Sequence, residues 1–180
     1  EQAARGESVR VRVGVTQTAA AEIMPAALRV FRDDHPGVEV VLVAADELES
    51  SRDGLLRGDF DLAFSYNSET DEYIEAIAVV EDSWVILTRR DSAIASLDRP
   101  DFTVLDQQDL VAWARRWRGQ AELEDGWARR GIAPKIVYRT DDNLALQRLV
   151  AAGLGHACIG RVAASRAATS RCKARLSSVR

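Results

Sequence analysis

Residues 11–64 read VRVGVTQTAAAEIMPAALRVFRDDHPGVEVVLVAADELESSRDGLLRGDFDLAF, and this stretch decides the fold. Valines at alternate positions before residue 16 predict a strand, and Pro36-Gly37 ends the helix that follows. Residues 38–44 form a nearly continuous apolar run, typical of a strand covered on both faces. The expected elements are a strand over 9–15, a helix over 22–34, a strand over 38–44, a helix over 46–57 and a strand over 60–64. This order predicts a parallel α/β unit.

The second half of the chain repeats the alternation of strands and helices. The expected elements are strands over 73–80 and 83–88, a strand over 110–113, a helix over 120–130, a strand over 135–139, a helix over 142–152 and a strand over 154–159. We therefore expect an α/β protein with two lobes, each a mostly parallel sheet flanked by helices. The expected organisation is a linker remnant over 1–8, a first lobe over 9–84, a second lobe over 85–160 and a basic tail over 161–180, which is a possible partial return to the first lobe.

Composition limits the classes of function. The chain has 180 residues, 47% hydrophobic and 29% charged, which is ordinary for a globular protein. No apolar run approaches the ~20 residues that span a bilayer, and the first residues lack the apolar core of a secretory signal. Two cysteines in different contexts fit a reducing cytoplasm. The chain lacks an initiator Met, so we expect an excised domain or a processed product.

Charge is spread unevenly along the chain. The net charge is −4, yet six of the 24 basic residues and none of the 28 acidic ones lie in 161–180. The rest of the chain is therefore strongly acidic, which argues against nucleic-acid binding by this segment. The basic tail reads as solvated, with contact to an anion as the alternative.

Three motifs resemble chemical sites, and each has a structural explanation. Gly153-Leu154-Gly155 closes a helix and opens a strand, the reverse of a dinucleotide-binding loop, so helix capping is expected. His156 and Cys158 share one strand face, but nothing nearby completes a nucleophilic or metal site, so a buried structural role is expected. No cofactor, no metal and no enzymatic activity are predicted.

Trp113, Trp117 and Trp127 intermix with arginines from Arg115 to Arg130. Basic residues with aromatics can bind single-stranded nucleic acid. The acidity of the chain favours a lobe surface and loop instead. The sharper alternative is that Trp117 or an arginine of this loop reaches an anionic ligand.

Three polar turns follow predicted strands. They contain Thr16, Gln17 and Thr18 after the first strand, Ser65 and Tyr66 after the third, and Thr140 and Asn143 after the strand over 135–139. In open α/β sheets, ligands bind beyond the carboxyl ends of the strands. The helix that follows the first turn adds free N–H groups and a positive dipole end, which suits a carboxylate. The structural alternative is that Thr18 caps this helix. Together the turns predict a ligand cleft formed by both lobes.

The helix over 22–34 is apolar over an arc of roughly 200°, whereas packing on one sheet needs a stripe of about 100°. The helix over 142–152 is also apolar almost all round. The excess width predicts a second buried contact, with another subunit.

These residues resemble the effector-binding domain of LysR-type transcriptional regulators. The resemblance covers residues 9 to 160. Its markers are VRVGV with Thr18, the helix with Met24-Pro25, His35-Pro36-Gly37-Val38, GDFDLA over 58–63, GIAP over 131–134 and LVAAGLG over 149–155. The order and spacing of these pieces together are specific. The resemblance implies a periplasmic-binding-protein-like (type 2) fold around a small-molecule cleft, with DNA bound only by a winged helix-turn-helix that this chain lacks.

The resemblance also implies roles for particular residues. The family's pocket residue after the first strand falls on Thr18, and the start of the second helix, with Ser50, often contributes. The family's antiparallel dimer implies pairing of helix 22–34 with helix 142–152 of the partner. The expected interface comprises Ile23, Met24, Ala27, Leu28, Phe31, Val40, Leu146, Leu149 and Val150. The full-length protein is expected to be a homodimer or a tetramer.

The chain departs from the family at Gly160, where the family usually has proline. The sequence therefore predicts a non-enzymatic, cytoplasmic, effector-sensing domain with an organic anion as its effector and no membrane partner. The alternatives are a solute-binding protein of a transport system, which shares this fold, and an enzyme built on it.

Overall fold

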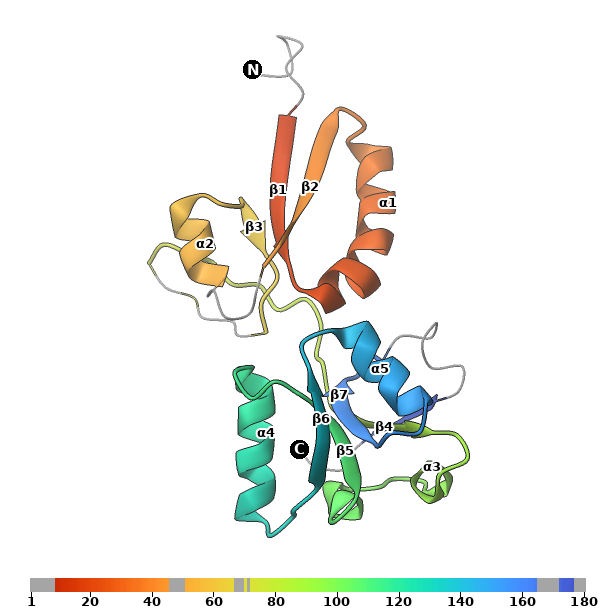
Figure 1. Cartoon of the computed structure of the whole chain (residues 1–180). Helices are drawn as coiled ribbons and strands as arrows, with labels where there is room; N and C mark the ends of the chain where they lie inside the picture. The colour runs from red at the N-terminus through yellow and green to blue at the C-terminus, as the bar shows by residue number, and fades with distance from the viewer. Residues whose placement is uncertain (1–8, 46–50, 67–69, 71, 165–171, 177–180) are drawn as a thin grey trace. The chain divides into compact units, whose positions relative to one another are not determined.

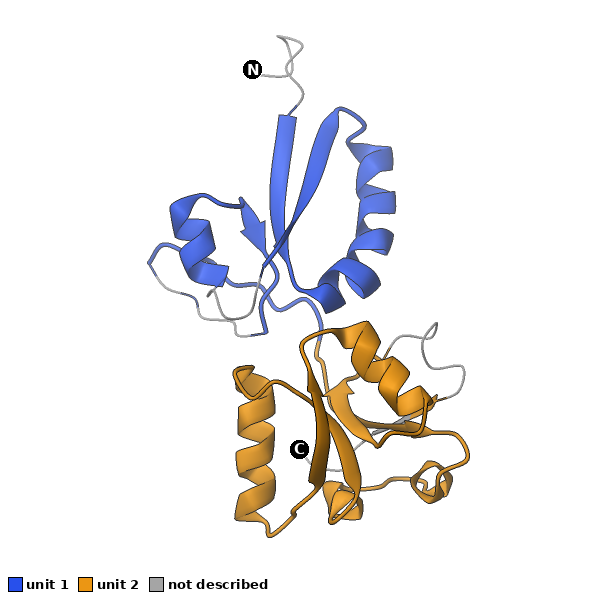
Figure 2. Cartoon of the chain, viewed as in Figure 1, with its two compact units in different colours: residues 1–80 blue, residues 81–180 orange. Residues whose placement is uncertain are grey.

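A computed structural model describes residues 9–45, 51–66, 70, 72–164 and 172–176 of the chain. The chain forms two compact units, residues 1–80 and 81–180 (Figure 2). The first unit therefore ends slightly before the boundary expected after residue 84. Within the described ranges, no helix has the length and apolar character needed to cross a membrane.

The first unit is a three-stranded parallel sheet with helices (Figure 1). Its elements are β1 (Val9–Val15), the π-helical turn η2 (Ala19–Ile23), α1 (Met24–Asp34), β2 (Val38–Ala44), α2 (Ser51–Arg57) and β3 (Leu62–Ala63). The strand order is β2-β1-β3, with both pairs parallel. The β-α-β-α-β order predicted from the sequence is confirmed.

The first helix begins earlier than predicted and contains a π-helical turn. Residues 17 and 18 are already helical, and the Met24 N–H donates to the Ala19 carbonyl, five residues back. Pro25 follows immediately and has no N–H, so it cannot donate to the carbonyl four residues before it. The wider turn lies where the proline interrupts the α-helical ladder.

The core of the first unit is small. Its buried members among the described residues are Val13, Val15, Ala19 and Met24, with half-buried Ile23, Leu28 and Val40 packed against them. Strand β2 lies at an edge of the sheet and is only partly covered, since Leu42 is 39% exposed. The prediction that this strand is covered on both faces is therefore wrong for the single chain.

Residues 73–80 do not form the predicted strand. The structure assigns them no regular element, and Tyr73, Ile77, Val79 and Val80 are all more than half exposed. The alternation of apolar residues was sufficient to predict a strand, but a strand also needs a hydrogen-bonded neighbour.

The second unit combines antiparallel and parallel pairs of strands. Its elements are β4 (Trp84–Arg89), α3 (Ala93–Ser96), the 3₁₀ turn η3 (Phe102–Leu105), β5 (Asp109–Trp113), α4 (Arg118–Arg129), β6 (Lys135–Thr140), α5 (Asn143–Ala151), β7 (Ala157–Gly160) and β8 (Cys172–Leu176). Strands β7-β4-β8 pair antiparallel, and β5 pairs with β6 in parallel. A parallel bridge between Leu110 and His156 links β5 to the start of β7.

The basic tail contributes to the second unit. Strand β8 pairs with β4 from Cys172 opposite Arg89 to Leu176 opposite Val85. The predicted return to the first lobe is therefore wrong for residues 172–176. On the side of β4 away from β7, β8 of the tail pairs with β4 and satisfies the backbone N–H and C=O groups of that edge.

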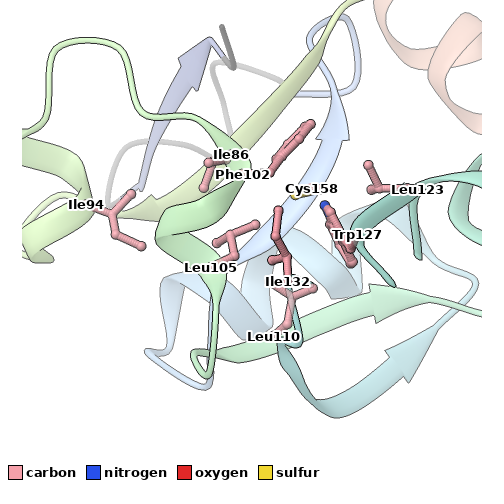
Figure 3. Close-up of a cluster of buried hydrophobic side chains, with 9 residues drawn as sticks. All are labelled: Ile86, Ile94, Phe102, Leu105, Leu110, Leu123, Trp127, Ile132 and Cys158. Atoms are coloured by element: carbon pink, nitrogen blue, oxygen red, sulfur yellow. The ribbon is translucent and has the colours of Figure 1, made fainter. Parts of the chain in front are cut away.

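The second unit has two buried clusters. Figure 3 shows the first, in which Cys158 lies among Ile86, Ile94, Phe102, Leu105, Leu110, Leu123, Trp127 and Ile132. The second consists of Val85, Leu87, Val111, Leu146, Val150, Ala157, Ile159 and Cys172. Leu146 and Val150 have no exposed surface. The prediction that these two residues contact a partner subunit is therefore wrong, because they fill the core of their own unit.

Candidate functional site

The carboxyl ends of the three strands of the first unit meet at one edge of its sheet. Gly14 of β1 is in register with Ala63 of β3, and the Phe64 N–H donates to the Gly14 carbonyl at 2.9 Å. The Ala45 N–H, after β2, donates to the Val15 carbonyl at 3.0 Å. The predicted residues Thr16, Gln17, Thr18, Ser65 and Tyr66 therefore lie at the same edge. Ser50, also predicted, lies outside the described residues.

Thr16 caps the first helix. Its Oγ1 accepts a hydrogen bond from the Ala19 N–H at 3.2 Å, and its carbonyl accepts from the Ala20 N–H at 2.9 Å. Thr18 has helical dihedral angles and its side chain makes no capping hydrogen bond. The structural explanation offered for Thr18 from the sequence is therefore wrong, because the helix begins before it.

The Thr18 hydroxyl has no hydrogen-bond partner among the described residues. Only 8% of the residue is exposed, and no side-chain cap bond uses its Oγ1. Its Oγ1 is not among the buried side-chain atoms that lack a partner in the described ranges, so a ligand can reach it. It lies at the start of a helix, where the dipole favours negative charge. A ligand carboxylate at this edge would accept the hydrogen bond that Thr18 can donate.

The second unit has a similar edge where β5 and β6 end. Trp113 and Thr140, the last residues of these strands, are in register. Helix α4 begins directly after Trp117, and α5 begins at Asn143. The structure therefore places the three residues predicted for this unit, Trp117, Thr140 and Asn143, near two helix N-termini at one edge of the sheet.

Asp141 organises this second edge. It accepts a hydrogen bond from Trp117 Nε1 at 2.9 Å and forms an ion pair with Arg116. Trp117 is also in ring contact with Trp113 at a centroid distance of 5.5 Å. Trp117 and Arg116 are thus already engaged by a carboxylate. Asp141 belongs to the polar turn predicted after this strand, but its pairing with Arg116 and Trp117 could not be predicted, since only the fold brings these residues together.

A second arginine is held in the same way. Arg139 forms an ion pair with Glu124 at 2.7 Å and donates to the Trp113 carbonyl at 2.9 Å. Burial raises the pKa of Glu124, but the hydrogen bonds from Arg139 and Gln120 outweigh it and hold that pKa below its usual value. The arginines near this edge therefore pair internally.

Thr140 and Asn143 have local structural roles as well. Thr140 Oγ1 accepts from the Asp142 N–H at 3.1 Å, and Asp142 caps α5 by accepting from the Ala145 N–H at 2.7 Å. Asn143 Oδ1 accepts from Gln147 Nε2 at 3.2 Å. These hydrogen bonds fix the positions of both predicted ligand residues.

The predicted interface residues differ in accessibility. Ala27 is exposed, Ile23, Leu28, Phe31, Val40 and Leu149 are half-buried, and Met24 is buried in the core of its unit. The sequence analysis missed Val30, Leu144 and Leu154, which are exposed at 58%, 56% and 39%. Val30 of α1, Leu144 of α5 and Leu154 after α5 are therefore exposed apolar residues that a partner could cover.

The Cys158 thiol is buried, and burial raises its pKa, so it is a poor nucleophile. Its burial supports the structural role predicted from the sequence. His156, by contrast, is only half-buried.

Residues 4–177 match the family described as LysR substrate binding domain. The chain is 26% identical over 151 residues to an uncharacterized HTH-type transcriptional regulator, YfeR, of Shigella flexneri, covering 82% of this chain and 48% of that protein. It spans about half the length of the curated relatives it matches.

Two solved structures share the fold. One is the CcmR regulatory domain of Synechocystis PCC6803 in complex with 2-PG (TM-score 0.77, 22% identity, 92% of this chain and 79% of that one). The other is the effector-binding domain of QuiR in complex with shikimate (TM-score 0.78, 18% identity, 95% and 81%). These likenesses confirm the predicted periplasmic-binding-protein-like (type 2) α/β fold. With the match over 4–177, they establish that the chain belongs to the LysR substrate binding domain family.

Proposed function

We propose that this chain is the effector-sensing domain of a LysR-type transcriptional regulator, and that it binds a small organic anion. DNA would be bound by a separate N-terminal winged helix-turn-helix of the full protein. The domain would act in the cytoplasm as part of a homodimer, without catalysis. The curated relatives are HTH-type transcriptional regulators, which favours this function over that of a transport protein with the same fold.

The observation that carries the proposal is the Thr18 hydroxyl. The Thr18 residue is almost fully buried at the carboxyl edge of the first sheet, and its hydroxyl has no hydrogen-bond partner in the described part of the chain. A carboxylate oxygen placed there would accept from Thr18 and gain from the helix dipole. The QuiR domain, which has this fold, is solved with shikimate, a carboxylate.

The edge with Thr140 and Asn143 would supply a second set of contacts to a ligand. Asp141 carries negative charge at this edge, but its ion pair with Arg116 offsets that charge, so an anion is not excluded there. A ligand shifts a conformational equilibrium only through different affinities for the two states. Sensing would therefore require that the anion bind two conformational states of the domain with different affinities.

Replacing Thr18 with Val tests the assignment. Calorimetry with a panel of carboxylates that includes shikimate would first identify a ligand for the unaltered chain. Val keeps the shape of Thr and removes the hydroxyl, so we expect the affinity for that ligand to fall by about tenfold or more, as for the loss of one charge-assisted hydrogen bond.

The free energy of unfolding should change little in this variant, because the Thr18 side chain makes no hydrogen bond in the described fold. Thr103→Val is the matched control, since the Thr103 hydroxyl donates to Asp101 Oδ1 away from both strand edges. Equal affinity of Thr18→Val and the unaltered chain would remove Thr18 from the site.

A further inference from the structure

The second unit contains a polar cavity at the opposite end of its sheet from Thr140 and Asn143. Its volume is about 450 Å³, and it lies where β4 ends and where β5 and β6 begin. It is lined by Arg89, Asp91, Ser92, Gln107, Gln108, Asp109, Lys135, Gly153, Gly155 and His156. The cavity is made entirely by residues 81–180 and is separate from both edges described above.

The backbone around this cavity is specialised. Gly155 has φ 151°, and a Cβ there would lie 2.8 Å from the Asp109 carbonyl oxygen. Gln107 has φ 58° and is the non-glycine residue with positive φ within the described ranges. A positive φ is costly for a residue with a side chain. Two residues that line the cavity, Gln107 and Gly155, thus have a positive φ that most residues with a side chain do not readily adopt.

His156 presents a hydrogen-bond acceptor to this cavity. Its Nδ1 lies 2.8 Å from Thr88 Oγ1, and Thr88 in turn donates to Ser92 Oγ at 2.8 Å. In the arrangement in which Thr88 donates to Ser92, Nδ1 donates to Thr88 Oγ1 and Nε2 keeps a lone pair. Burial lowers the pKa of His156, which favours this neutral form.

The Nε2 atom of His156 is accessible. No hydrogen bond to it occurs in the described part of the chain, and it is not among the buried side-chain atoms that lack a partner there, which are Trp127 Nε1 and Gln147 Oε1. His156 lines the cavity, so this nitrogen can accept a hydrogen bond from a bound molecule.

Two opposite charges of the cavity remain uncommitted. Arg89 is paired with Asp91. Asp109 and Lys135 are register partners at the starts of β5 and β6, yet neither forms an ion pair with any described residue within 4.0 Å. Asp109 lies near enough to His156 to act on its pKa, in the direction of raising it. One cation, one anion and one neutral acceptor therefore face the same space.

We propose that this cavity binds a small zwitterion, with an ammonium group held by Asp109 and His156 Nε2 and a carboxylate held by Lys135. A free α-amino acid has this chemistry. A simple anion would leave Asp109 without a partner, and a simple amine would leave Lys135 without one. The proposal is independent of the effector site at Thr18, because it uses other residues of another unit.

The two histidines of the chain make a direct test possible. His156 lines the cavity, and His35 follows α1 in the first unit. L-serine would be titrated into the whole chain while the imidazole signals of both histidines are followed by NMR. We expect a saturable shift of the His156 signals, with the His35 signals unchanged as the internal reference.

The charge requirement is tested with analogues and variants. Ethanolamine lacks the carboxylate and 3-hydroxypropionate lacks the ammonium, so each should bind at least about tenfold more weakly than L-serine. Lys135→Gln and Asp109→Asn should weaken L-serine by a similar factor. Arg29→Gln, at an exposed position of α1, is the matched control and should have no effect.

Several outcomes would overturn the proposal. They are the absence of a saturable His156 shift, equal binding of 3-hydroxypropionate and L-serine, or unchanged affinity in both Lys135→Gln and Asp109→Asn. Loss of L-serine binding in Thr18→Val would place the amino acid at the effector edge instead. A Thr18→Val variant that loses carboxylate affinity but keeps the His156 response would support both sites separately.

Discussion

Thr16 and Thr18, two residues apart at the end of β1, have different roles. Thr16 caps the helix, whereas Thr18 is buried with its hydroxyl unused in the described fold. Because the cap bond is already supplied by Thr16, the hydroxyl of Thr18 contributes little to folding. It is therefore available for a ligand, which is why a single hydroxyl-to-methyl change separates binding from stability.

Gly160 shows how one residue accommodates a departure from the family. A Cβ at this position would lie 2.3 Å from Asp82 Oδ2. Asp82 Oδ1 accepts a hydrogen bond from the Val162 N–H at 2.9 Å. Glycine thus leaves room for a carboxylate that holds the turn after β7. Proline, usual at this position in the family, would not leave that room.

His156 should make stability depend on pH. Its pKa is lowered in the folded chain from its ordinary 6.5, chiefly by burial. The unfolded chain therefore binds this proton more readily, so the contribution of His156 is fully present above pH 6.5 and is lost as the pH falls from there through the folded pKa. Urea unfolding at a series of pH values measures this dependence.

In His156→Gln this part of the pH dependence should disappear. At lower pH the folded chain still loses the stability contributed by acidic residues such as Asp61, whose pKa is lowered by Arg12. The side chain of Gln keeps a polar group near Thr88 and does not titrate. An identical pH profile for the variant and the unaltered chain would show that His156 does not titrate differently on folding.

At the scale of elements, α1 has one face packed on its sheet and apolar surface left over. Ile23 and Leu28 pack against the core, whereas Ala27 and Val30 are exposed. Strand β2 is likewise an edge strand with Leu42 partly exposed. The dimer interface predicted from the wide apolar arc of this helix remains a prediction, and these exposed apolar residues are the positions at which to test it.

Ala27→Glu should therefore weaken self-association without unfolding the chain. Ala27 is exposed in the single chain, so a charge costs little there, but burying that charge in a dimer interface is unfavourable. Sedimentation velocity over a range of concentrations should show a shift toward monomer. Arg29→Glu, an exposed polar position of the same helix, should leave the dimer intact.

Leu146→Ala provides the contrasting control. Leu146 is fully buried in the second unit, so this change should lower the free energy of unfolding by about 2–5 kcal/mol. Unchanged association of Ala27→Glu would remove this face of α1 from the interface, and a monomeric unaltered chain would contradict the predicted dimer.

The two units of the whole molecule differ in the size of their cores. The described part of the first unit has one cluster of four buried apolar residues, whereas the second has clusters of nine and eight. Since apolar burial is the main source of stability, the first unit should open at a lower free energy. Local opening of this kind is what hydrogen exchange measures.

Hydrogen exchange with mass spectrometry should thus show faster exchange for the amides of β1 and β2 than for those of β4 and β5. Leu110→Ala, in a core of the second unit, should reduce the difference by accelerating β4 and β5 alone. Equal protection of both units before any substitution would mean that they unfold as one cooperative body.

The sequence predicted features that depend on neighbouring residues and did not predict features that depend on contacts between distant parts of the chain. Alternation and periodicity depend on neighbouring residues, so the strands β1, β2 and β6 and the helices α1, α4 and α5 were found close to their places. Residues 73–80 were not, because a strand needs a partner elsewhere in the chain. Of the candidate ligand residues, those after strands in the described ranges lie at two sheet edges, whereas Ser50 lies outside these ranges and ligand binding remains a prediction.

By itself, the sequence determined the order of elements in the first unit, the family and the polar turns at the strand ends, since these are local patterns. Only the tertiary structure decided which polar groups are already paired. It joined Arg116 and Trp117 to Asp141, and among the described residues it left the Thr18 hydroxyl without a hydrogen-bond partner and Asp109 and Lys135 without an ion pair. Hydrogen bonds and ion pairs join residues far apart in the chain, so their pattern emerges only when the fold brings those residues together.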